Sequence, residues 1–171
     1  MITVADAASR LASNGEIFRA LVDGVSSEEA RWKPAEDQWS VLEVVCHLRD
    51  EEVEDFRRRL DLTLHRPEEA WPSIDPPRWA VERRYNERSL AASLEGFLEE
   101  RGRSVEWLRG LEAPDLSRSC SHPRLGRLSA GDLLTSWLAH DLIHVRQITR
   151  VRYGWLERTA APWRPDYAGP F

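Results

Sequence analysis

The sequence SAGDLLTSWLAHDLIHVRQITRV, residues 129–151, carries the strongest helical pattern of this chain. Its apolar residues recur every three or four positions, which predicts one helix with a single core-facing stripe. Ser129 and Asp132 stand three residues apart just ahead of the stripe, the spacing of a helix capping box. His140 and His144 fall inside the apolar sector, so this helix is expected to turn two imidazoles toward the protein core.

Three other segments share this spacing and predict three more helices. They are a first helix capped by Thr3 and reaching Val25, a second running from the Ser40-x-x-Glu43 capping box to about Leu64, and a third with its stripe from Leu90 to Leu108. Polar and proline-rich stretches, residues 26–38, 65–85 and 112–128, separate the four segments and are expected to be irregular. The predicted class is therefore all-α, a four-helix bundle with a long crossover between helices two and three.

The length of 171 residues is that of one domain. Gly154 is placed to end the fourth helix, and the prolines beyond it exclude further helix. We expect residues 1–154 to form the bundle and residues 155–171 to form a proline-rich tail that packs on the bundle or stays mobile.

Composition excludes several classes of function. The 24 basic and 29 acidic side chains give a net charge of -5 and alternate along the chain, so no basic face for nucleic acid is expected. No apolar run approaches the roughly 20 residues that span a bilayer, which argues against a membrane partner. Two cysteines and no signal pattern at the N-terminus favour a cytoplasmic protein without disulfides.

The pair His140 and His144 has the spacing of a metal-binding clip. Residues four apart on a helix are neighbours, so both rings can reach one ion. Asp141 and Gln147 are near enough to accept a hydrogen bond from the ring nitrogens that do not bind metal. The alternative is two core histidines bonded to carbonyl groups, and a third ligand would decide between the two interpretations.

His47, in the middle of the second predicted helix, is the candidate for that third ligand. A helical wheel places it outside the apolar sector, beside Glu43, Glu51 and Glu54. The alternative interpretation is therefore a solvated polar face. In the functional interpretation the face lines an acidic cavity, where Glu51 and Glu54 are the candidate catalytic base or the outer partners of the ligands.

Four other residues carry structural expectations. Arg101 lies on the apolar stripe of the third predicted helix, so it needs a carboxylate or carbonyl partner, as a structural tie or as part of a polar site. Cys46 is expected to pack against another helix and not to act as a nucleophile beside His47. Trp137 and Trp39 are expected to be packing residues, with Trp39 covering the end of the bundle.

Three segments resemble the DinB-like superfamily of metal-binding four-helix bundles, which includes thiol S-transferases and a mycothiol-dependent isomerase. They are Trp39-Ser-Val-Leu-Glu-Val-Val-Cys-His-Leu48, His122-Pro-Arg-Leu-Gly-Arg-Leu-Ser129 and Trp137-Leu-Ala-His-Asp-Leu-Ile-His-Val-Arg-Gln-Ile148. The resemblance covers the chain to about Tyr153. It implies an up-down-down-up order of the helices, and it implies that His47, His140 and His144 are the metal ligands.

Three histidine ligands leave coordination positions open, as in a catalytic metal site. Zinc or nickel is the expected divalent metal, with iron or manganese as alternatives. The resemblance favours a thiol transferase that uses a low-molecular-weight thiol on a small-molecule substrate. A metal-dependent hydrolase that activates water is the alternative enzyme, and a metal- or ligand-binding protein without turnover is the alternative class. We expect the chain to form a homodimer.

Overall fold

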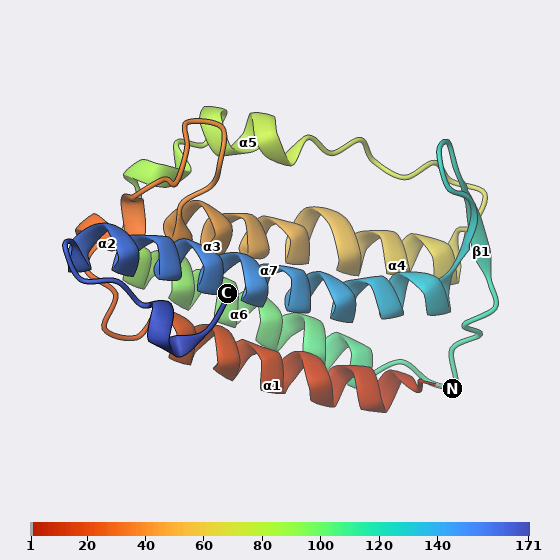
Figure 1. The fold of residues 1–171 in the computed structure, drawn as a ribbon. Helices are drawn as coiled ribbons and strands as arrows, with labels where there is room; N and C mark the ends of the chain where they lie inside the picture. The colour runs from red at the N-terminus through yellow and green to blue at the C-terminus, as the bar shows by residue number, and fades with distance from the viewer. Residues whose placement is uncertain (1) are drawn as a thin grey trace.

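The computed structural model describes residues 2–171, in which four long helical rods pack side by side (Figure 1). One rod is formed end to end by α3, the π-helical segment η1 and α4, and the others are α1, α6 and α7. The helical elements are α1 (Val4–Val22), α2 (Ser27–Arg31), α3 (Val41–Asp50), η1 (Glu51–Phe56), α4 (Arg57–His65), α5 (Pro76–Glu82), η2 (Tyr85–Glu87), α6 (Leu90–Arg109), α7 (Ala130–Ala160) and η3 (Asp166–Ala168). The strands are β1 (Ser119–His122) and β2 (Gly126–Ser129).

The rods follow the up-down-down-up order that the resemblance implies. In Figure 1, α1 and α7 run in one direction, whereas the α3–α4 rod and α6 run in the other. The consecutive rods α4 and α6 are therefore parallel, so the chain between them must return along the whole bundle. Residues 66–89 make this return, and α5 lies along the outside of the α3–α4 rod (Figure 1).

Capping boxes start three of the rods. The Thr3 side chain accepts from the Asp6 backbone N–H at the start of α1, and the Asp6 carboxylate accepts from Thr3 in return. Ser129 and Asp132 make the same reciprocal pair at the start of α7. At the start of α3 the pair is formed by Ser40 with Glu43. The caps at α3 and α7 satisfy backbone N–H groups that have no partner inside the helix, as the sequence predicts.

A polar layer lies between two of the three apolar clusters that residues 2–171 form in the interior. One cluster includes Leu11, Leu60, Leu108, Leu134 and Trp137, and the other includes Phe18, Val44, Leu48, Phe97 and Ile148. Each rod contributes to the layer between them. Its buried members include Glu52 of η1, Arg101 of α6, and Asp141 and His144 of α7, and the half-buried Asn14 of α1 lies at its edge. Buried polar side chains need partners, so this layer is where a site is expected.

Some local expectations were wrong. The 26–38 connection contains α2, and the 65–85 crossover contains α5, because Pro76 and Pro77 occupy the first helical positions, where a missing N–H is no loss. The segment 112–128 contains strand β1 and the start of β2, which pair as an antiparallel hairpin.

The fourth helix continues past Gly154 to Ala160, so Gly154 is not its C-terminal cap. A Cβ atom at Gly154 would stand 3.1 Å from the Trp32 ring. The absence of a side chain at Gly154 therefore allows the Trp32 indole to pack directly on α7. Beyond the helix the tail turns back along α7 (Figure 1), and the Phe171 ring stacks on Tyr153 with centroids 4.4 Å apart.

Candidate metal centre

The structure brings His47, His140 and His144 together, as the sequence predicts. His47 comes from α3, and the other two come from successive turns of α7. The His47 Nε2 atom lies 3.3 Å from His140 Nε2, which in turn lies 3.0 Å from His144 Nε2. One ligand atom from each of the three rings lies within 4.8 Å of the others.

These separations suit a common ion. Two nitrogens bound to one tetrahedral zinc at about 2.0–2.1 Å each stand roughly 3.3 Å apart. The observed separations of 3.3 and 3.0 Å are close to that value.

The outer ring nitrogens show where the protons lie. The His144 Nδ1 atom is 2.7 Å from Oε1 of Gln147, an acceptor, so the proton belongs on Nδ1 and the Nε2 lone pair faces the other rings. The His47 Nδ1 atom lies 3.5 Å from Glu51 Oε1, and both atoms are buried without a hydrogen-bond partner. A proton on His47 Nδ1 would point at this carboxyl and leave a second Nε2 lone pair facing inward.

All three imidazoles are neutral at pH 7. Burial, followed by the nearby His144, lowers the pKa of His47 to about 3. Burial and the charges of His144, His47 and Arg101 lower the pKa of His140 to about 2. Burial also lowers the pKa of His144. Neutral imidazole is the form that binds metal ions, so the protein holds the rings ready for a cation.

Aromatic side chains surround the three histidines. The Trp39 ring lies 4.7 Å from the His47 ring, and the Phe56 ring meets His140 edge-on at 5.0 Å. His47 and His144 are buried, whereas His140 is only half-buried. Trp39 was expected only to cover the end of the bundle, so its contact with His47 is a finding of the structure.

The face of α3 that carries His47 is buried, and the solvated alternative for it is wrong. His47 has 4% of its surface exposed, Glu43 has 6% and Glu51 has 4%. Burial and the neighbouring Asp55 raise the pKa of Glu51 to about 9, so in the metal-free chain this carboxyl keeps its proton at neutral pH. Glu54 is not brought to the histidines, since its ion pairs are with Arg58 and Arg83.

Of the two residues on α7 that were expected to accept a hydrogen bond from a histidine ring, Gln147 does so and Asp141 does not. Gln147 contacts His144 as predicted. Asp141 instead accepts hydrogen bonds from Arg101 and Asn14 and is fully buried among them. Cys46 is buried with its sulfur near Ser93, as expected of a packing residue.

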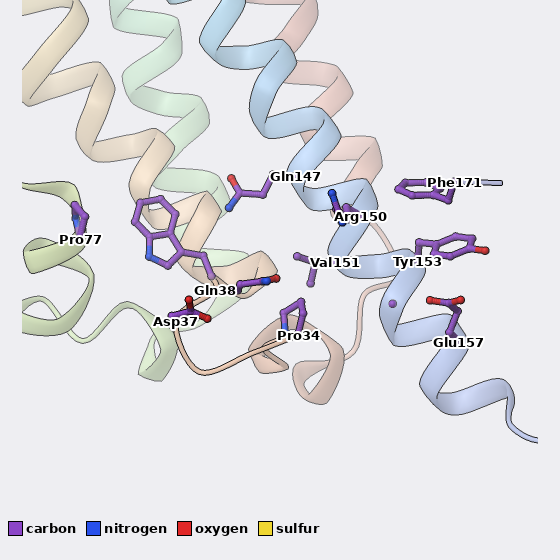
Figure 2. A pocket seen from close by; sticks show the side chains of 12 residues that line it. Pro34, Asp37, Gln38, Pro77, Gln147, Arg150, Val151, Tyr153, Glu157 and Phe171 are labelled. Carbon is purple, nitrogen blue, oxygen red and sulfur yellow. The ribbon is translucent and has the colours of Figure 1, made fainter.

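An open pocket of about 860 Å³ lies near the three histidines, although none of them lines it. Trp39 and Gln147, which contact His47 and His144, also line the pocket. Figure 2 shows Gln147, Arg150, Tyr153 and Glu157 along one helix, with Phe171 of the C-terminal tail beside it. The remaining lining residues are Pro34, Asp37, Gln38, Pro77, Val151 and Gly154. Two side chains in contact with the histidines thus also line a cavity of the size that holds small molecules.

A family model described as the DinB superfamily matches residues 10–148. The chain belongs to the DinB superfamily. The fold of this DinB-superfamily chain is similar to that of YfiT from Bacillus subtilis, with a TM-score of 0.78 and 20% sequence identity over 94% of this chain and 91% of YfiT. YfiT is described as "a probable metal-dependent hydrolase with an unusual four-helix bundle topology". No curated protein matches the sequence significantly. Within residues 2–171, every helix is too short or too polar to span a bilayer.

Proposed function

We propose that this chain is a metal-dependent hydrolase in which His47, His140 and His144 hold one divalent cation. The observation that carries the proposal is the convergence of three neutral imidazole nitrogens, with an open pocket nearby that is lined by Trp39 and Gln147. We favour an enzyme over a binding protein without turnover because three histidine ligands leave coordination positions open on the ion, as in catalytic metal sites. The description of YfiT supports hydrolysis as the reaction class, whereas thiol transfer is supported by family resemblance alone.

The residues present fit such a cation. His47 Nδ1 and Glu51 Oε1 are buried polar atoms without partners. Such atoms are rare in proteins, which indicates that these groups serve a binding site and not only packing. Three imidazoles suit zinc or nickel, and also iron or manganese. When bound, the ion supplies Lewis acidity, which polarises a substrate oxygen and lowers the pKa of a water or thiol nucleophile.

The chain's own residues orient the ligands and receive the substrate. Gln147 holds the proton of His144 on Nδ1 and so presents Nε2 inward. Glu51 faces His47 in the same manner, and its burial makes it an orienting residue and not a base in contact with substrate. Trp39 and Gln147 form the boundary between the histidines and the pocket, where a small-molecule substrate would lie. A homodimer remains our expectation for the assembly.

Metal analysis of protein purified without an affinity tag tests the site. We expect one equivalent of divalent metal in the wild type and a loss of stoichiometric metal in the alanine variants of His47, His140 and His144. His65→Ala and His122→Ala are matched controls that should keep the metal, because neither residue belongs to the group of three. Wild-type occupancy in any of the three site variants would overturn the ligand assignment, and equal losses in all five would indicate misfolding.

A substrate screen of the metal-loaded protein tests the reaction class. Ester, amide and phosphoester panels are compared with an electrophile panel supplied with low-molecular-weight thiols. Turnover of a hydrolysable substrate that disappears in the His140→Ala variant supports the proposal. Turnover only with a thiol would show instead that the family's transferase chemistry applies to this chain.

A further inference from the structure

Arg101 of α6 is the centre of the polar layer, and its guanidinium donates four hydrogen bonds. It is 3% exposed, and the Asp141 carboxylate accepts from Nη1 at 2.6 Å and from Nη2 at 2.7 Å. Glu52 Oε1 lies 2.9 Å from Nε and 2.8 Å from Nη2, and the Leu11 carbonyl accepts from Nη1 at 3.0 Å. A guanidinium has five N–H donors in a rigid fork, and four of them are used in these hydrogen bonds, while Nη2 also lies within ion-pair distance of Glu52.

The partners of Arg101 join all four rods at the level of the metal centre. Leu11 lies on α1, Glu52 on η1 and Asp141 on α7. The side chains of α1 and α7 extend the network, because the Asn14 amide donates to Asp141 and the Trp137 indole donates to Glu52.

Two of these partners directly adjoin residues of the site. Glu52 follows Glu51, which faces His47, and Asp141 follows His140. The network therefore connects the segment next to His47 to the turn of α7 that carries His140.

Stability alone is a weak explanation for this network. Removing an arginine and two carboxylates from water carries a large desolvation penalty, and well-packed apolar residues often stabilise such a position equally well. Glu52 Oε2 is moreover buried without a partner. A buried ionic network is best accounted for where it fixes one arrangement of the helices.

We propose that Arg101 is a positioning residue of the metal centre that acts through His47. This inference rests on the proposed function. His140 and His144 share one helix, so helix geometry alone holds their separation. The position of His47 relative to His140 and His144 depends on how the rod that contains α3 and η1 packs against α7. Arg101 is hydrogen-bonded both to that rod and to α7. Metal–nitrogen distances stay within about 0.2 Å of their usual values, so a shift between the rods would move His47 out of bonding distance or strain its contact with the ion.

The test is a double-mutant cycle on zinc affinity, with Arg101→Lys and His47→Ala as its two changes. Lysine keeps the positive charge but cannot form the fork between two carboxylates. In the wild-type background we expect Arg101→Lys to weaken zinc binding by about 10–100-fold, the loss typical of residues that orient metal ligands. In the His47→Ala background, zinc binding is weak and is followed by NMR at millimolar concentrations. There we expect Arg101→Lys to leave the residual zinc affinity nearly unchanged, because the ligand through which Arg101 acts is already absent.

Arg57→Lys is the matched control. Arg57 reaches Glu100 and Ser104 of α6 from the same rod that carries η1, so it also joins two rods, but its recorded bonds do not involve α7. This variant should bind zinc as the wild type does. Asp141→Asn, which breaks the fork on the α7 side at nearly constant volume, replaces Arg101→Lys if that variant does not fold, and the same pattern is expected.

Each outcome separates the inference from the proposed function. A wild-type affinity in folded Arg101→Lys protein, or an equal fold-loss in both backgrounds, would overturn the positioning role while leaving the metal site intact. A wild-type chain that binds neither zinc nor nickel, iron or manganese would overturn the proposed function, and the inference with it.

Discussion

Acidification should destabilise the metal-free protein in part through His47, and the size of this effect follows from its burial. The pKa of His47 is about 3 in the native state, because burial and His144 disfavour the charged ring. In the unfolded chain the pKa of histidine is about 6.5. Between these values the unfolded state binds a proton that the native state does not, so the free energy of unfolding falls as the pH falls below 6.5.

The magnitude is about 1.4 kcal/mol for each pH unit in that window. Between pH 7.5 and pH 5.0 the window covers roughly 1.5 units, so His47 accounts for a loss of about 2 kcal/mol. His47→Gln removes this group and keeps a polar side chain at the site. Its loss of stability over the same pH change should therefore be smaller than that of the wild type by about 2 kcal/mol.

Urea unfolding of both chelator-treated proteins at pH 7.5 and pH 5.0 measures the difference. His65→Gln is the control, because His65 lies at the exposed end of α4 and its variant should lose as much stability as the wild type. An equal loss in the wild type and His47→Gln would refute the reasoning, since it would show that His47 takes up its proton in the folded state.

Three further predictions follow from the same site. Trp137→Ala should lower the free energy of unfolding by about 3–5 kcal/mol in denaturant titrations, because the ring is buried against Phe56 and donates to Glu52; an unchanged value would contradict this. Gln147→Leu should weaken zinc binding by about 10–100-fold in a chelator competition, because His144 loses the acceptor for its Nδ1 proton, and wild-type affinity would exclude that role. The melting temperatures of metal-loaded and chelator-treated protein should differ at pH 7.5 and converge between about pH 6 and pH 4, because the ligands must stay neutral; a gap that widens in acid would argue against histidine ligands.

The parts of the site that depend on one helix could be predicted from the sequence. His140 and His144 are joined by α7 alone, and its start at Ser129 is encoded by a local capping box. A helical wheel predicts that His140 and His144 share one face, because the wheel uses only the spacing of residues along one helix. Ser40 and Glu43 set the start of α3 in the same local manner.

The environment of His47 could not be predicted in this way. A wheel describes one helix and assigns every polar face to water, whereas the face with Glu43, His47 and Glu51 is buried by distant parts of the chain. One of the covering groups, Trp39, precedes the helix, and the partner rings come from α7, 93 residues away in the case of His140. The resemblance placed His47 at the site where periodicity alone did not.

Gly154 and the π-helical segment show the same limit. Glycine commonly ends a helix, so a local rule placed the end of α7 there, but the space that Gly154 leaves is filled by Trp32 from another part of the chain. The widened turn of η1 interrupts an otherwise regular periodicity and buries Glu51, Glu52, Asp55 and Phe56. π-Helical turns occur often at functional sites, but no residue in this segment predicts a π-helical turn.

The order of the ligands along the chain has a consequence for how the protein is made. During synthesis the ribosome delivers His47 early, with the second rod, whereas His140 and His144 emerge only with the last one. A nascent chain that ends at Arg109 already contains three of the four rods but only one of the three histidines. In the proposed metal site, capture of the ion would therefore wait until α7 docks, and its uptake would mark the completion of folding.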